Sequence, residues 1–160
     1  MFREMRRKNQ RLTEAECAKI LHKNTSGVLA VLGDEGYPYA VPLSYVCDGN
    51  ALYVHCAKSG HKLDAVKACN KVSFCVIDQD EVVPEEYTTY YRSVILFGRA
   101  HIVEAREEIS DAIQKLAIKY HPTDTKENRD REIEKSLARL CILKIEIEHI
   151  TGKEAKELAK

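Results

Sequence analysis

The sequence has 160 residues, enough for one domain with a substantial hydrophobic core. Hydrophobic residues make up 44% of it and charged residues 31%, proportions typical of a soluble globular protein. Lys and Arg together number 25, and so do Asp and Glu, so no net charge attracts nucleic acid or an anionic membrane surface. An anionic ligand would therefore have to be held by a local cluster of cations.

Residues 1–12 are basic and polar, and they lack the apolar core that a secretory signal peptide needs. No stretch of the sequence approaches the roughly 20 apolar residues that span a bilayer. The six cysteines form no C-x-x-C pair, and the histidines show no zinc or iron ligand spacing, so no metal site is expected. Reduced thiols without an export signal predict a cytoplasmic protein.

The first half of the sequence predicts a helix followed by an antiparallel meander. Thr13 and Glu16 have the spacing of a capping box, which predicts a helix over residues 13–24. Strand-like runs follow at residues 27–32, 37–46 and 51–56, joined by short turns at 33–36 and 48–50. Turns of this length connect antiparallel neighbours.

The second half alternates helices with further strands. We predict helices at 61–70, 104–120 and 126–138, strands at 72–77, 87–103 and 140–148, and an acidic loop at 78–86. Gly98 marks the expected bend of the long strand, and the polar tail from Thr151 is expected to be frayed. The order predicts a single α+β, mainly β domain of about six strands: a barrel at 25–103 with the inserted helix 61–70, then a helical segment at 104–138 and a closing strand at 140–148.

The segment L-Y-V-H-C-A-K-S-G-H-K-L at residues 52–63 runs from a strand through a small turn into a helix rich in positive charge. The first N–H groups of a helix lack intrahelical partners and favour an anion, and Lys58 and Lys62 add charge there. Ser59 is placed to cap the helix, and His61 can donate as well. The segment predicts a phosphate site, although an ordinary helix start with solvated lysines has the same pattern.

The segment Tyr37–Tyr45 has the small residues and prolines of a surface for a flat ligand. Strand alternation places Ala40, Pro42 and Ser44 on one face, and Val41, Leu43 and Tyr45 on the other. Because proline has no N–H to donate, a simple edge strand explains the same composition.

Arg92 and Ser93 precede an apolar run at residues 94–97 in the long strand. Arg92 fits either a phosphate contact or a solvated strand position. The run must be covered on both faces of the sheet, which predicts a homodimer.

Together these segments resemble the pyridoxamine 5′-phosphate oxidase-like superfamily, and within it the branch of nitroimidazole-resistance reductases. The shared motifs, in chain order, are R-R, G-V-L-A, Y-P-Y-A-V-P-L-S-Y, L-Y-V-H-C-A-K-S-G-H-K, V-S-F and Y-R-S-V-I-L-F-G-R-A. The ending T-G-K-x-A is familiar in that branch. The sequence lacks the basic C-terminal substrate signature of true pyridoxamine-phosphate oxidases, which argues against oxidation of vitamin B6.

The resemblance implies an antiparallel, six-stranded split β-barrel that dimerises and holds flavin mononucleotide (FMN) at the dimer interface. It implies that the flavin ring system is lined by Pro42, Leu43, Ser44 and Tyr45. It implies that His55, Cys56 and Ala57 lie along the flavin and that Lys58, Ser59, His61 and Lys62 hold its phosphate. From the long strand, Ser93 and Val94 would contact the cofactor, beside Arg92.

The resemblance also implies an oxidoreductase that reduces a small electrophile, such as a nitroaromatic, with a reduced nicotinamide or another donor. Two alternatives remain open: a flavin-binding stress-response module without turnover, and a haem-binding split barrel. Because a flavin carries out the electron transfer itself, no acid–base constellation is required. His55 is the candidate for chemistry, with a structural histidine as the alternative, and Cys56 is expected to be a strand residue pointing away from it.

Overall fold

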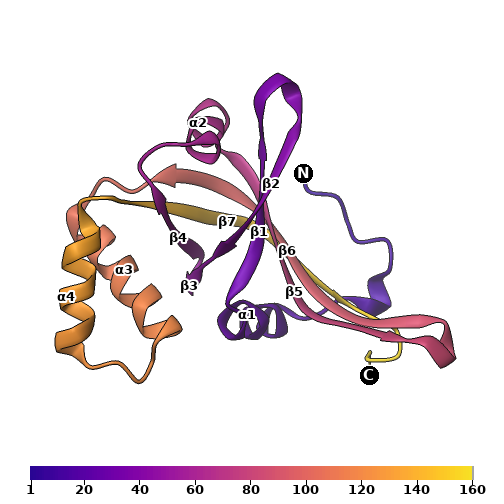
Figure 1. The fold of residues 1–160 in the computed structure, drawn as a ribbon. Helices are drawn as coiled ribbons and strands as arrows, with labels where there is room; N and C mark the ends of the chain where they lie inside the picture. Colours follow the sequence, from indigo (N-terminus) through magenta and orange to yellow (C-terminus); the bar gives the residue numbers. More distant parts are fainter. Residues whose placement is uncertain (160) are drawn as a thin grey trace.

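The computed structural model describes residues 1–159, in which seven strands form one antiparallel sheet in the order β2-β1-β5-β6-β7-β4-β3 (Figure 1). The strands are β1 (Ser26–Leu32), β2 (Pro38–Ser44), β3 (Val46–Asp48), β4 (Ala51–Ala57), β5 (Lys71–Val83), β6 (Thr88–Ile102) and β7 (Leu140–Glu154). The helices are α1 (Glu14–Lys23), α2 (His61–Ala68), α3 (Arg106–Tyr120) and α4 (Lys126–Leu137). The mainly β, α+β fold is confirmed, but it has seven strands in place of the six expected.

The seventh strand arises because the predicted strand 37–46 is interrupted at Tyr45. β2 pairs with β1, whereas β3 pairs with β4 at the opposite edge of the sheet. The Tyr45 ring is fully buried, and its hydroxyl donates to the Leu21 carbonyl at 2.7 Å. The Tyr45 backbone N–H donates to the Tyr120 hydroxyl at 2.9 Å. Tyr45 is therefore part of neither the β1–β2 ladder nor the β3–β4 ladder. The chain therefore crosses from one half of the sheet to the other at a buried tyrosine.

Two hydrophobic cores flank the sheet. The larger one is enclosed by the curled sheet together with α1 and α2, and Phe74 and Leu96 are among its fully buried residues. The smaller one lies between α3 and the β3-β4-β7 half, and it includes Ile113 and Ile142. Because β4 has a core on each side, residues 51–54 are all buried and do not alternate.

The predicted acidic loop at 78–86 is wrong. β5 continues to Val83 and pairs with β6 as far as Thr88, so that only the tip, Pro84–Glu86, is a turn. The resulting hairpin extends away from the body of the molecule (Figure 1). The acidic residues form a strand because the facing segment is rich in Thr and Tyr, which favour β-structure and supply the ladder partners.

The predicted frayed tail is also wrong. β7 runs past residue 148 to Glu154 and pairs with β6 from Arg92 onward. Gly152 lies so close to α1 that an added Cβ would be 2.6 Å from Cys17 Sγ. The tail is ordered by this packing, which polarity alone does not reveal.

Two local predictions are confirmed. The capping box begins α1, with the Thr13 N–H donating to Glu16 Oε2 at 2.8 Å. The β6–β7 register shifts between Phe97 and Gly98, and a Cβ on Gly98 would lie 2.1 Å from the Glu146 carbonyl oxygen. Within residues 1–159, no helix has the length and apolar character needed to cross a membrane.

Candidate functional site

The sheet does not close, and its two halves meet where β2 contacts β4. On the β2 side of this split, Pro42 and Ser44 are exposed, whereas Leu43 packs against the core and Tyr45 is buried. This alternation matches the predicted one. Leu43 can therefore offer only backbone atoms to a ligand in the split, because its side chain packs inward. The backbone N–H and carbonyl of Tyr45 are both bonded to the Tyr120 hydroxyl.

On the β4 side, His55 and Ala57 are exposed and Cys56 is buried between them. His55 and Ser44 line one cavity of about 430 Å³, and most of its other lining residues belong to α3 and α4. Its apolar wall consists of Ile113, Leu116, Ala117, Ile133 and Leu140. The structure thus brings together two residues that are eleven positions apart in sequence, at one end of the split.

The loop that leads into α2 follows directly after the end of β4, the strand that carries His55 and Ala57. The expected cap by Ser59 is wrong: Gly60, with a φ of 131°, occupies the N-cap position, and no side chain caps the helix. The Leu63 N–H makes the first helical bond, to the Gly60 carbonyl at 2.9 Å. The N–H groups of His61 and Lys62 precede that bond and are not used by the helix.

His61 connects the start of α2 to the β1–β2 hairpin. Its ring stacks on Tyr39 with centroids 4.2 Å apart, and its Nε2 accepts from the Asp34 N–H at 3.4 Å. Tyr39 belongs to the same strand as Pro42 and Ser44, so His61 ties the helix to the β2 side of the split. Sequence reasoning gave no signal for this stacking, because the two rings are 22 positions apart.

The cationic residues of the loop differ in their surroundings. Lys62 is half-buried in the first turn of α2, whereas Lys58 is exposed and lines a separate cavity with Arg106. Burial and the neighbouring Cys141 thiol raise the pKa of Cys56 to about 11, and the charge of Lys62 opposes this rise. Cys56 is therefore protonated near neutral pH, as expected for a buried strand residue.

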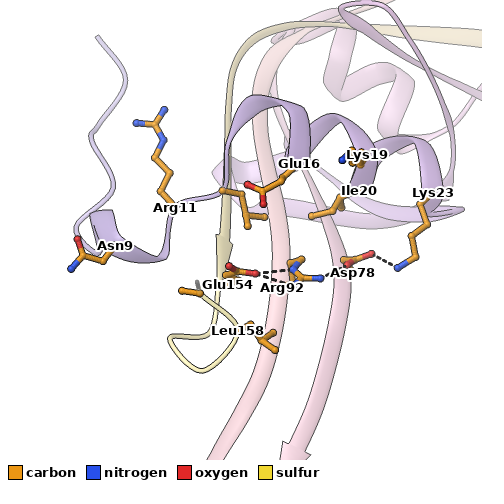
Figure 2. A pocket seen from close by; sticks show the side chains of 12 residues that line it. Asn9, Arg11, Glu16, Lys19, Ile20, Lys23, Asp78, Arg92, Glu154 and Leu158 are labelled. Atoms are coloured by element: carbon orange, nitrogen blue, oxygen red, sulfur yellow. Dashed lines mark hydrogen bonds and ion pairs between the residues drawn. The ribbon is translucent and has the colours of Figure 1, made fainter.

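Arg92 lies elsewhere, beneath α1 (Figure 2). Its Nε donates to Glu154 Oε2 at 3.0 Å, and its Nη1 lies 3.7 Å from Asp78 Oδ2. Burial alone would raise the pKa of Asp78, but hydrogen bonds from Asn24 and Lys23 and the charge of Arg92 lower it. Arg92 is thus paired with two carboxylates of its own chain, and the structure does not place it beside the 58–62 loop.

Ser93 and Val94, the two other β6 residues expected to contact the cofactor, point to opposite faces of the sheet. Val94 is fully buried. Ser93 lies on the outer face with Ile95 and Phe97, and these two apolar side chains are each 41% exposed. The register connects this outer face across the sheet: Ile95 faces Cys75, Cys75 faces Val28, and Val28 faces Pro42. The exposed apolar face of β6 is therefore continuous with the β2 surface at the split.

Within residues 1–159, no group of three or more His, Cys, Asp or Glu residues is arranged to hold a metal ion. Sequence reasoning did not find the cavity at His55. Ile113, Leu116 and Ala117 have the spacing of one helical face, but this spacing does not show that the face meets the end of β4.

Comparison with known proteins gives one family and a consistent fold. The model of the family described as pyridoxamine 5′-phosphate oxidase matches residues 13–154. No curated protein sequence matches the chain. Three similar solved structures come from Mycobacterium tuberculosis, Bacteroides thetaiotaomicron and Mesorhizobium loti.

The M. tuberculosis structure is conserved hypothetical protein Rv2991, with 20% identity, a TM-score of 0.84, and coverage of 98% of this chain and 94% of that one. The B. thetaiotaomicron protein is assigned to 5-nitroimidazole antibiotic resistance, with 18% identity, a TM-score of 0.77, and coverage of 90% and 86%. The M. loti protein is described as FAD-binding, with 25% identity, a TM-score of 0.67, and coverage of 92% and 98%.

Proposed function

Since the chain belongs to the pyridoxamine 5′-phosphate oxidase family, we propose that it binds FMN in the split between β2 and β4 and acts as a flavin-dependent oxidoreductase. One observation carries the proposal. The split has a cationic helix start at one end and an apolar cavity lined by His55 and Ser44 at the other. A site with one cationic end and one apolar end suits a ligand with a phosphate at one end and a flat aromatic system at the other.

The residues present fit such a ligand. At the phosphate end, the free N–H groups of His61 and Lys62 and the Lys62 ammonium are the donors. Along the ring system, the exposed faces of Pro42, Ser44 and Ala57 provide a surface without large side chains. We name FMN rather than FAD because the loop offers one phosphate site and no G-x-G-x-x-G motif follows a strand. Arg92 receives no role, since Glu154 and Asp78 neutralise it.

The proposal includes a homodimer with the flavin at the interface. The exposed β6 face at Ile95 and Phe97 continues across the sheet to Pro42 beside the split. A second copy packed on this face would cover the apolar surface and bring another β6 close to the split. Ser93, which lies on the same outer face, would then contact the cofactor from the second copy.

The bound flavin would carry the electrons from a reduced nicotinamide or another donor to the substrate. The chain's own contribution is the apolar cavity beside His55, which would orient a small electrophile such as a nitroaromatic and exclude water. His55 would donate a proton to the reduced substrate, since it lines the same cavity and histidine is the side chain most often used for general acid–base transfer. Flavin binding without turnover is the alternative.

The test is the visible spectrum of the purified protein, with chromatography of any chromophore released on denaturation, and calorimetric titration with FMN, FAD and haem. We expect a visible spectrum with the absorption bands of oxidised flavin. In the titrations, FMN should bind stoichiometrically and more tightly than FAD. The absence of FMN binding at high micromolar concentration would refute the proposal, and a Soret band on haem titration would favour the haem alternative. Consumption of NADH or NADPH in the presence of a nitroaromatic separates an enzyme from a flavin carrier.

A further inference from the structure

Cys56 and Cys141 face each other across the β4–β7 ladder, next to the loop that leads into α2. The register pairs these two residues directly. On the same ladder, the Ile147 N–H donates to the Asn50 carbonyl at 3.0 Å, so alternation from there makes Cys56 and Cys141 a hydrogen-bonded pair. The Cα atoms of such a pair lie about 5.5 Å apart, a separation typical of disulfide-linked residues. Opposed residues of a ladder project to the same face of the sheet, so the two thiols lie on one side of it, and Cys141 packs against the core that contains Cys56.

The two thiols differ in access. Cys56 is only 7% exposed, whereas Cys141 is half-buried and lines a cavity of about 760 Å³ next to the end of α4. Lys58 and Arg106 line this cavity, but so do Glu104 and Glu134. Since the charges balance, access rather than local charge makes Cys141 the thiol that a small oxidant meets first.

We propose that Cys56 and Cys141 form a reversible intrachain disulfide when the protein meets a hydroperoxide. The Cys141 sulfur first takes one oxygen atom from the hydroperoxide, which is reduced to an alcohol, or to water if it is hydrogen peroxide. The Cys141 sulfenic acid then condenses with the Cys56 thiol. In that step the S–S bond forms and the S–O bond breaks, and the Cys56 proton leaves with the hydroxyl group as one water molecule.

The ladder geometry makes this link easy to reduce. Opposed Cβ atoms in a hydrogen-bonded pair are about 5.5 Å apart, whereas a disulfide holds them at about 4 Å, so the strands must move together. The pair lies one position from the end of the ladder, which finishes at Ala57 and Leu140, and the strands can adjust there. A strained disulfide is more readily reduced than a relaxed one, and this favours a reversible modification over a permanent crosslink.

The position of the pair means that a disulfide there would affect the loop between β4 and α2. Ala57 follows Cys56 directly and ends β4, just before the turn that leads to α2, and the charge of Lys62 acts on the Cys56 thiol. A bond between β4 and β7 at this point would fix the base of the loop. The proposed disulfide involves the two thiols alone, so it can form whether or not the protein binds FMN.

The test uses the full-length protein, first reduced, then treated with hydrogen peroxide and alkylated before peptide mapping without reductant. We expect a crosslinked peptide pair containing Cys56 and Cys141, with the mass of the chain lowered by about 2 Da for the two lost hydrogens. Treatment with dithiothreitol should return both thiols. Dimedone, which traps sulfenic acids, should label Cys141 in Cys56→Ser but label no residue at position 56 in Cys141→Ser.

Cys75→Ser is the matched control, because Cys75 is also half-buried but faces Val28 and Ile95 rather than another cysteine. It should leave the crosslink unchanged. The inference is overturned if Cys56 stays free to alkylate in oxidised wild-type protein, or if crosslinks join two chains instead. It is equally overturned if oxidation modifies Cys75 while Cys141 remains reduced.

Discussion

Replacing Lys62 by alanine tests where the phosphate end of the proposed FMN site lies. Lys62 is half-buried in the first turn of α2, and among residues 1–159 no carboxylate forms an ion pair with it. Its charge is therefore available to a ligand. A charge-assisted hydrogen bond contributes about 1.5–3 kcal/mol, so Lys62→Ala should weaken FMN binding by about tenfold to a hundredfold.

The assay is calorimetric titration of wild-type and variant protein with FMN and with riboflavin, which has no phosphate. Lys62→Ala should weaken FMN binding and leave riboflavin binding nearly unchanged. The fold should tolerate the change, because a lysine at the positive end of a helix dipole contributes little to stability.

Lys67→Ala provides the matched control. Lys67 is exposed and lies in the last turn of the same eight-residue helix, away from its N-terminus. We expect FMN affinity close to that of wild type. Equal losses for FMN and riboflavin in Lys62→Ala, or equal effects of the two variants on FMN, would refute the reasoning and place the phosphate elsewhere.

Three further predictions concern assembly and stability. Ile95→Lys should turn the proposed homodimer into a monomer in sedimentation, whereas Ile118→Lys, at a similarly exposed position on α3, should not; a wild-type monomer with flavin bound would contradict the dimer. Gly98→Ala places a Cβ against the Glu146 carbonyl oxygen and should destabilise the fold by about 1–3 kcal/mol in chemical denaturation, and an unchanged midpoint would contradict this packing. The lowered pKa of Asp78 means that its carboxylate stabilises the fold above about pH 4 and that this contribution is lost as pH falls through the folded-state pKa. Wild type and Asp78→Asn should therefore converge in stability at low pH, and a constant difference between them would argue against the ion pairs.

Much of the fold could be predicted because it is encoded by neighbouring residues. The capping box at Thr13, the amphipathic α3 and the bulge at Gly98 each depend on residue types within one or two turns of the chain. The alternation of β2 likewise determined which side chains, Pro42 and Ser44, face outward. The strand-loop-helix pattern at residues 52–63 identified the cationic helix start, although not the residue that caps it.

The tertiary structure decided which segments meet, since pairing partners are distant in sequence and local patterns do not specify them. Tyr45 divides one apparent strand because its ring is buried against Leu21 and its backbone bonds to Tyr120. The acidic segment became part of a hairpin because a β-favouring strand faces it. The sequence likewise left Arg92 open between a phosphate contact and a solvated strand position, and the long-range pairing of β6 with β7 places it against Glu154 beneath α1.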